Sequence, residues 1–270
     1  MRILPFAGLA LSGLFFIPVA HAACDTVLAA QVREINAPGS YCLAANRDAP
    51  IEIRADDVEL DCRGRSLIHP VQEPSWSSGV HLIRGNNVTV RNCRFEGWTL
   101  SLVAEQFANV RILNNTFLPE GPAITVYGSD RPDGDGAQII GNRVIFYGSR
   151  QGAEHAIGVW HSPRAVLTNN LVAGFQGSTS VRLDHSPDAQ LTGNQLLDLN
   201  EGAATAFELV DSPRGRFVHN TVMLRRGVDA RGLRGALEAT CIENVLINVV
   251  RAGLEGCVVA RYNVEKINND

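Results

Sequence analysis

The fold is decided by one short stretch of sequence, Leu167-Thr168-Asn169-Asn170-Leu171-Val172. In it an apolar residue is followed by two variable positions, an Asn, one more variable position and a second apolar residue. The same phrase recurs at intervals of 22 to 28 residues, with Cys93 in the Asn position of the first copy and then Asn115, Asn142, Asn170, Asn194, Asn220 and Asn244. A strand-like phrase repeated with a period of this length is typical of a solenoid.

A second strand pattern lies upstream of the Asn phrases. Its outer residues are apolar and its middle residue varies, as in Val80-His81-Leu82, Ile124-Thr125-Val126, Ile157-Gly158-Val159, Val181-Arg182-Leu183 and Phe207-Glu208-Leu209. This alternation indicates a strand with one buried face. Three of these strands end in a proline turn, His161-Ser162-Pro163, His185-Ser186-Pro187 and Asp211-Ser212-Pro213. Each coil is therefore predicted to run strand, Ser-Pro turn, strand, Asn turn and a variable return, with the Asn side chains hydrogen-bonded between coils.

The opening coils carry a resemblance to a known family. The phrases Val58-Glu59-Leu60-Asp61-Cys62-Arg63-Gly64 and Asn87-Val88-Thr89-Val90-Arg91-Asn92-Cys93, with the repeats that follow, resemble the right-handed parallel β-helix proteins of the pectate-lyase-like group. The resemblance covers about Ile51 to Tyr262. It implies an all-β, single-stranded solenoid of roughly eight coils over 51–270 and an N-terminal cap over 23–50. It also implies sugar binding or sugar cleavage. A leucine-rich repeat lacks support because its Leu frame is absent, and a β-sandwich would show no repeated Asn.

The N-terminus predicts export. Residues 1–22 read as a signal peptide, with Arg2, an apolar stretch from Leu9 to Val19 and a small-x-small site at Ala20-His21-Ala22. We expect a periplasmic or secreted protein; attachment of lipid at Cys24 is disfavoured by His21. No later segment is apolar and long enough to span a membrane. The formal charge of −4 argues against a nucleic-acid partner.

Six cysteines in an exported chain predict disulfides. Fifteen pairings are possible in principle. Pairing by proximity joins Cys24 with Cys42, Cys62 with Cys93 and Cys241 with Cys257. The alternative for Cys93 is a buried free thiol, since it occupies an inward position. A metal site is disfavoured because no two cysteines lie within four residues of each other.

Stacked coils bring outward residues together in columns. One predicted column runs His81, Val103, Thr125, Gly158, Arg182 and Glu208, and the next runs Ile83, Glu105, Tyr127, Trp160, Asp184 and Val210. A turn column holds His161, His185 and Asp211. The candidate catalytic residues are Arg182, Asp184, His185 and Glu208. The candidate substrate-binding residues are Tyr127, Trp160, His161 and His81.

These residue types suit carbohydrate chemistry. Tyr127 and Trp160 offer flat apolar faces to sugar rings, and Arg182 can grip a uronate carboxylate. Strand spacing puts Asp184 and Glu208 about 8 Å apart, in the range of an inverting hydrolase. In a lyase or epimerase, Arg182 or His185 would remove the proton beside the carboxylate. The leading hypothesis is a protein that binds or processes an acidic polysaccharide.

Other hypotheses stay open. Arg182 and Glu208 fall on adjacent strands, where opposite charges pair for purely structural reasons. The protein would then be a non-catalytic carbohydrate-binding or scaffold module of the cell envelope, or an accessory in metal-enzyme maturation. No metal ligand set is predicted, and a cofactor is not required. Calcium is conceivable at the acidic loop Asp130–Asp135, although the sequence there lacks a full calcium-loop pattern.

Overall fold

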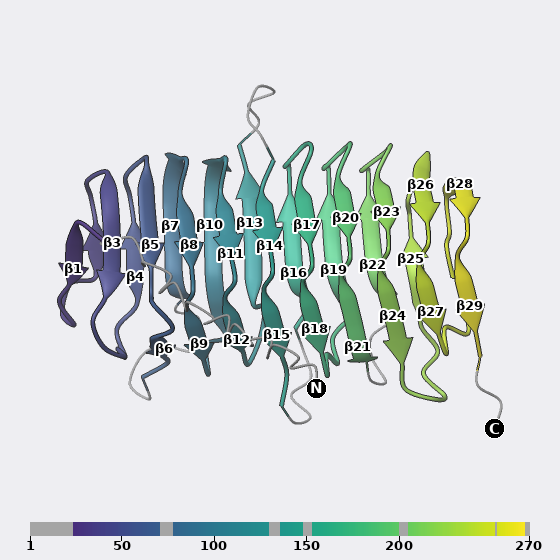
Figure 1. The fold of residues 1–270 in the computed structure, drawn as a ribbon, viewed down its shortest axis with the longest axis horizontal. Coiled ribbons are helices and arrows are strands. Elements are labelled where there is room, and N and C mark those ends of the chain that lie inside the picture. Colours follow the sequence, from purple (N-terminus) through teal and green to yellow (C-terminus); the bar gives the residue numbers. More distant parts are fainter. Residues whose placement is uncertain are drawn as a thin grey trace, which may run out of the picture.

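The computed structural model describes residues 24–70, 78–129, 136–147, 153–199, 205–251 and 253–267. Over these ranges the chain forms strands and turns with no helix, stacked as one elongated solenoid (Figure 1). The predicted signal peptide and the loop Asp130–Asp135 lie outside the described residues. No helix in the described part is long and apolar enough to cross a membrane.

The strands of the described ranges form three sheets, here called A, B and C. Sheet A has eleven strands in the order β1 (Thr26–Leu28), β3 (Gly39–Leu43), β5 (Val58–Asp61), β8 (Thr89–Arg91), β11 (Arg111–Leu113), β14 (Gln138–Ile140), β17 (Val166–Thr168), β20 (Gln190–Thr192), β23 (Arg216–Val218), β26 (Ala239–Ile242) and β28 (Cys257–Arg261). Sheet B has nine, β2 (Glu34–Ile35), β4 (Ile51–Ile53), β7 (Ser78–Asn86), β10 (Leu100–Ala108), β13 (Ile124–Gly128), β16 (His155–Trp160), β19 (Thr179–Asp184), β22 (Thr205–Val210) and β25 (Arg231–Arg234). Sheet C also has nine, β6 (Ser66–Ile68), β9 (Arg94–Glu96), β12 (Thr116–Leu118), β15 (Arg143–Ile145), β18 (Leu171–Ala173), β21 (Gln195–Leu199), β24 (Thr221–Leu224), β27 (Val245–Ile247) and β29 (Val264–Lys266).

Each central coil passes through the three sheets in the order B, A, C. The coil that begins at β7 continues through β8 and β9, and the next runs through β10, β11 and β12. Neighbouring coils pair in parallel in all three sheets. The predicted right-handed parallel β-helix is confirmed. Strands β1, β2 and β3, which fall in the segment predicted as a cap, are the first strands of sheets A and B.

The Asn phrase forms a continuous buried ladder at the bend between sheets A and C. The Oδ1 atom of Asn170 accepts the backbone N–H and the Nδ2–H of Asn142, both at 3.0 Å, and its own Nδ2 donates to Asn194 at 3.0 Å. The ladder continues past the predicted copies to Asn263, which accepts from Asn244. The phrase misses Asn263 because Glu265 stands where an apolar residue is expected. Stacked amides thus satisfy the turn groups that each coil buries.

The residue before each ladder Asn adopts a left-handed backbone. Asn114 and Asn169 have φ of 54°, and glycine fills the same position at Gly141 and Gly193. Asn and Gly are the residues that tolerate this conformation at lowest cost. The doublets Asn-Asn and Gly-Asn in the repeats therefore mark one left-handed residue followed by one ladder residue.

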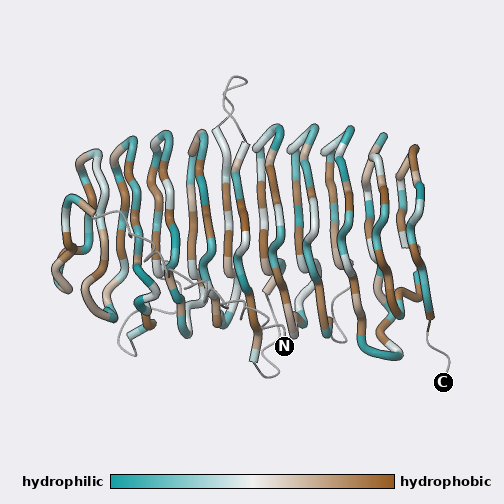
Figure 2. The backbone as a smooth tube through the Cα atoms, in the orientation of Figure 1, coloured by the Kyte–Doolittle hydropathy of each residue, from teal (hydrophilic) through white to brown (hydrophobic). Residues whose placement is uncertain are grey.

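The interior is filled by the inward residues of the three sheets. Figure 2 shows apolar segments recurring at matching places along successive coils. The rings of Phe95 and Phe117 stack with centroids 4.7 Å apart, and the buried Trp98 donates its Nε1–H to the Leu67 carbonyl at 2.9 Å. Full burial of a Val, Leu, Ile or Phe side chain stabilises the fold by about 1.5–3 kcal/mol each. Stacking of coils therefore supplies the core that a single coil lacks.

The three disulfides join Cys24 with Cys42, Cys62 with Cys93 and Cys241 with Cys257. The pairing predicted by proximity is confirmed, and Cys93 is not a free thiol. Cys24–Cys42 lies at the first strands of sheet A, and Cys241–Cys257 joins β26 to β28 at the other end. Disulfides of this kind persist in oxidising compartments.

Candidate functional site

The outer face of sheet B carries the two predicted columns. Strand register pairs His81, Val103, Thr125, Gly158, Arg182 and Glu208 in turn, and the column continues to Arg234. The second column pairs Ile83, Glu105, Tyr127, Trp160, Asp184 and Val210. Both registers agree with the prediction. A shift of one residue between neighbouring strands would turn the apolar side chains outward, so only one register keeps them in the core.

The Ser-Pro turns set the orientation of the third column. Ser186 is fully buried; its Oγ accepts the backbone N–H of Ser162 at 3.2 Å and donates to the Asp184 carbonyl at 3.0 Å. The Ser212 Oγ accepts the Ser186 N–H in the same way at 2.9 Å. The residues that precede these serines are left-handed, with φ of 49° at His161 and 47° at His185. The serine ladder therefore anchors the turn while the preceding side chain projects outward.

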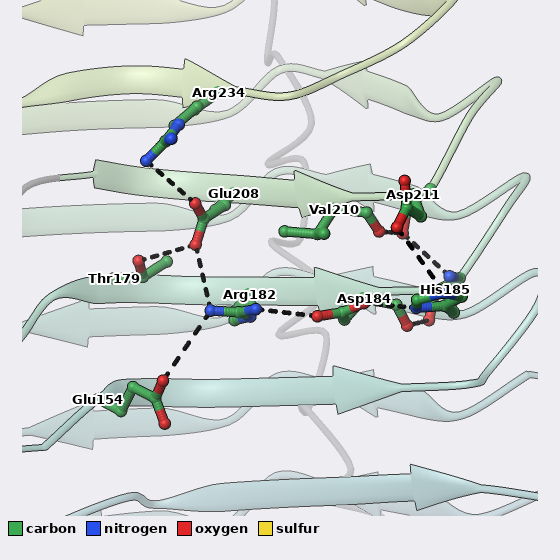
Figure 3. Close-up of polar contacts among 11 residues, drawn as sticks. Glu154, Thr179, Arg182, Asp184, His185, Glu208, Val210, Asp211 and Arg234 are labelled. Atoms are coloured by element: carbon green, nitrogen blue, oxygen red, sulfur yellow. Dashed lines mark hydrogen bonds and ion pairs between the residues drawn. The ribbon is translucent and has the colours of Figure 1, made fainter.

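Arg182 is the centre of a network of charges (Figure 3). Its guanidinium contacts Asp184 on the same strand, with Nη2 2.9 Å from Oδ2. It also approaches Glu208 on the next strand, with Nη1 3.7 Å from Oε2, and Glu154 on the preceding coil at 4.0 Å. The hydrogen bond to Asp184 and the neighbouring carboxylates raise the pKa of Arg182. To grip a substrate carboxylate, Arg182 would have to exchange one of these partners for the ligand.

Two of the network's carboxylates, Asp184 and Glu208, are nearly buried and accept hydrogen bonds or ion pairs from several donors. The Oε2 atom of Glu208 accepts the Thr179 hydroxyl at 3.2 Å, and Oε1 lies 3.4 Å from the Arg234 guanidinium. Burial raises the pKa of the Asp184 carboxyl, but hydrogen bonds from Arg182 and His185 outweigh it, so that the pKa lies below its ordinary value. Asp184 is therefore ionised at neutral pH, which does not suit a general acid.

His185 forms a carboxylate–imidazole pair with Asp184. The distance from Nδ1 of His185 to Oδ1 of Asp184 is 2.6 Å. An ionised carboxylate can only accept, so Nδ1–H is the hydrogen-bond donor. The Nε2 atom lies 3.7 Å from Oδ2 of Asp211, and the ring stacks on His161 with centroids 4.9 Å apart. About half of the His185 side chain is exposed, at 55%. A histidine oriented in this way presents its other nitrogen as a proton acceptor.

The predicted aromatic residues form a platform beside this network. The rings of Tyr127 and Trp160 stack with centroids 5.0 Å apart and planes inclined by 28°. The indole lies over Gly158, where a Cβ would come within 2.3 Å of the ring. Tyr127 is 41% exposed. Partial burial, with the charges of Glu105 and Glu154, raises the pKa of Tyr127. The platform is thus partly exposed to solvent at Tyr127 and lies near the charges of Glu105 and Glu154.

Sequence reasoning missed His155, which lies beneath the platform. Its ring meets the Trp160 indole edge-on at 4.9 Å, and Nε2 is 3.1 Å from Oγ1 of Thr125. Only 5% of the residue is exposed. Burial, together with the positive charge of Arg182, lowers the pKa of His155 to about 4. Its position at the start of β16, two residues before the alternating triplet, could have indicated a site residue.

The structure separates His81 from the rest of the predicted site. Four strand steps lie between His81 and Arg182, about 19 Å at the usual spacing of parallel strands. The Nε2 atom of His81 is 3.5 Å from Oε1 of Glu105. His161, by contrast, lies on a hollow of about 730 Å³ that Arg84 and Gln106 also line. The structure thus brings together the network and the aromatic pair, places His161 between the network and the hollow, and leaves His81 outside the site.

The comparison with known families agrees with this architecture. The model described as the right-handed β-helix region matches residues 78–238, more than half of the chain. The chain belongs to the right-handed β-helix family. No curated protein and no solved structure matches it.

As a right-handed β-helix, the protein presents long rows of side chains on a rigid sheet. Within the described ranges, no group of three His, Cys, Asp or Glu side chains is placed to hold a metal ion. What sheet B does place together is an aromatic platform, an ionised carboxylate and an oriented imidazole. This arrangement can stack on a ring, accept hydrogen bonds from hydroxyl groups and accept a proton at His185.

Proposed function

We propose that this protein is exported and binds a polysaccharide across β13, β16, β19 and β22 of sheet B. The observation that carries the proposal is the stacked pair Tyr127–Trp160, part exposed and adjacent to the network of Arg182, Asp184 and Glu208. Exposed aromatic faces beside fixed polar groups suit a ligand that is apolar on its ring face and polar at its edges.

The charge network supports binding in two ways. Asp184 and Glu208 are held in place by their neighbours, yet a carboxylate oxygen accepts more than one hydrogen bond and so retains capacity for ligand hydroxyls. The network is also pre-organised, because its members bond one another before any ligand arrives. Pre-organisation reduces the entropy that binding would otherwise cost.

Export is supported by two independent features. The predicted signal peptide over 1–22 has the charge, apolar stretch and cleavage site of such segments. The three disulfides are suited to an oxidising compartment and not to the cytosol of an ordinary cell. A periplasmic or secreted β-helix would meet polysaccharides of the cell envelope.

A second candidate function is proton transfer on a bound uronate, as in a lyase or epimerase. The Asp184–His185 pair favours it, since the ionised carboxylate accepts a hydrogen bond from Nδ1–H and leaves Nε2 to remove the proton beside a substrate carboxyl group. Hydrolysis has less support. An inverting hydrolase needs one protonated carboxyl group, and the pKa of Asp184 is lowered instead of raised.

Binding is tested with a panel of uronate and neutral oligosaccharides by isothermal titration calorimetry. We expect Trp160→Ala to weaken the affinity for the bound sugar about tenfold, from the loss of one stacking face. Tyr262→Asn is the matched control: Tyr262 is exposed at the far end of the solenoid, and Asn tolerates its φ of 57°. Equal loss in both variants would contradict the proposal, as would the absence of binding to every member of the panel.

Catalysis is tested separately by incubating the same sugars with the protein in D2O. Epimerisation would place deuterium on the carbon beside the carboxylate, and elimination would give an unsaturated uronate, both visible by proton NMR and mass spectrometry. We expect His185→Gln to abolish either product while binding persists. A product that survives this substitution would exclude His185 as the base; no product with retained binding would leave a binding module.

A further inference from the structure

A polar groove begins where the aromatic platform ends. It lies at the carboxyl ends of β7, β10 and β13 and at the turn after β16, and it encloses about 730 Å³. Arg84, Gln106 and His161 line it, with Gly128 at its base. Gly128 directly follows Tyr127 and His161 directly follows Trp160, so the groove and the platform share one surface. The function proposed above does not use this groove.

Arg84 is the unusual member of the groove. In the part of the chain that the structure describes, no hydrogen bond or ion pair engages its guanidinium. Two arginines on the outer faces differ in this respect: Arg182 contacts Asp184, and Arg91 contacts Glu59 at 2.7 Å. Two carboxylates line the same surface as Arg84 but contact other groups: Asp56 accepts the Asn86 N–H at 2.7 Å, and Oε1 of Glu105 lies 3.5 Å from Nε2 of His81. The Arg84 guanidinium therefore lines a hollow with no hydrogen-bond or ion-pair partner among the described residues.

The backbone explains how this side chain reaches the groove. Arg84 and Gln106 both have a left-handed backbone, with φ of 56° and 58°. Between β10 and β13, Gln106 is one extra residue, which is a bulge, whereas β7 and β10 stay in register with Arg84 and Gln106 at equivalent unpaired positions. A bulge ends the in–out alternation, so that the two side chains leave the strand ends next to each other.

Glycine permits a close backbone approach beside the groove. A Cβ at Gly128 would lie 2.1 Å from the carbonyl oxygen of His161, so any other residue would push the turn after β16 away. Gly85 is less constrained, since a Cβ there would lie 3.1 Å from the Phe107 ring and 3.2 Å from Oδ1 of Asp56. Gly128 therefore allows the turn that carries His161 to pack against the end of β13.

We propose that this groove is a subsite for an anionic substituent of the polysaccharide, a carboxylate or a sulfate ester, bound by the Arg84 guanidinium with the Gln106 amide as a second donor. The proposal rests on polysaccharide binding at the adjacent platform. An arginine fork matches either anion with two parallel hydrogen bonds. Arg84 then determines the preference for an anionic ligand, whereas Arg182 is already paired with Asp184.

The test compares an oligogalacturonate, its fully methyl-esterified form and a sulfated neutral oligosaccharide of the same length by calorimetry. We expect the intact protein to bind one anionic ligand about tenfold more tightly than the neutral ester, from one pair of charged hydrogen bonds. Arg84→Gln should remove this preference and leave affinity for the ester unchanged. Arg84→Lys should keep part of it, because it retains the charge but not the fork. Arg111→Gln, on the exposed face of sheet A, is the matched control.

The outcomes separate the subsite from the platform. A preference for the carboxylate over the sulfate, or the reverse, identifies the anion. Equal binding of all three ligands, or a preference that survives Arg84→Gln, overturns the subsite while polysaccharide binding stands. If Trp160→Ala weakens binding of all three ligands about tenfold but keeps the preference for the anion, and Arg84→Gln alone loses that preference, both the platform and the subsite are supported. If the intact protein binds none of the three, the proposed function fails and the subsite fails with it.

Discussion

At the scale of single residues, the solenoid depends on side chains that bond from one coil to the next. Asn170 joins three coils, because it accepts two hydrogen bonds from Asn142 and donates to Asn194 and to the Ile139 carbonyl. All of these groups are buried. A residue of this kind cannot be replaced by a smaller one without leaving polar atoms unsatisfied.

Asn170→Ala is expected to lower the free energy of unfolding by about 3 kcal/mol, since the buried Asn142 N–H and Ile139 carbonyl lose their partners. Chemical denaturation monitored by circular dichroism measures the change. The neighbouring Asn169→Gly is the control: Asn169 is exposed at a φ of 54°, where glycine fits, and the change should stay within about 1 kcal/mol. Similar losses in both variants would contradict a structural role of the ladder.

His155 is a second residue with a predicted effect on stability, here through pH. Its pKa is about 4 in the folded chain against an ordinary 6.5, so the unfolded chain binds the proton more readily between these values. Its contribution to stability is complete above pH 6.5 and is lost as the pH falls toward 4. We expect a loss of about 2 kcal/mol between pH 7 and pH 5. Urea denaturation of His155→Gln should lack this loss; an unchanged pH dependence would contradict it.

At the scale of elements, Gly158 on β16 determines where the Trp160 ring lies and therefore how it stacks on Tyr127 of β13. The Trp160 ring folds back along its own strand over Gly158 and reaches Tyr127 on β13. The strand therefore needs a residue without a side chain two positions before the indole. The alternating triplet Ile157-Gly158-Val159 keeps its apolar residues inward and leaves the glycine outward, under the ring.

Gly158→Ala should displace the Trp160 ring and weaken sugar binding about as much as Trp160→Ala, because a Cβ would come within 2.3 Å of the indole. The fold should lose no more than about 2 kcal/mol, since both groups that the Cβ would meet, the indole and the His155 ring at 2.6 Å, are side chains and not backbone. A double-mutant cycle decides the mechanism: in the Trp160→Ala background, Gly158→Ala should have no further effect on affinity. An additional loss there would show that Gly158 acts in another way.

At the scale of the whole molecule, a solenoid has local contacts and two ends. Each coil touches only the coils before and after it, so stability varies along the axis. The C-terminal strands β28 and β29 are mostly exposed and have one neighbouring strand each. The Cys241–Cys257 disulfide ties this last coil to β26.

Removing that disulfide should loosen only the C-terminal end. In Cys241→Ala/Cys257→Ala we expect amide hydrogens of β28 and β29 to exchange up to roughly a hundredfold faster, with β16 and β19 unchanged. Hydrogen exchange with mass spectrometry resolves these segments. Cys62→Ala/Cys93→Ala is the control, because it removes a disulfide far from this end. Faster exchange along the entire chain in the first variant would contradict local stability.

The sequence by itself determined the repeat, the strand register, the Asn ladder and the disulfide pairing. These features follow from short patterns, because the same residue types must recur wherever one coil stacks on the next. The columns through Arg182 and Asp184 could be written down in advance for that reason. Asn263 belongs to the ladder but was not predicted, because Glu265 occupies the position where the repeat has an apolar residue.

Only the tertiary structure decided which outward side chains are occupied, buried or available. The columns alone do not show that Arg182 is shared among carboxylates, that His155 is buried beneath Trp160, or that Arg84 lacks a partner. Such outcomes depend on rotamers, on bulges such as the one at Gln106, and on coil lengths that vary between repeats. Backbone stacking is periodic and can be read from a pattern; the pairing of individual charges is a matter of a few ångströms in three dimensions.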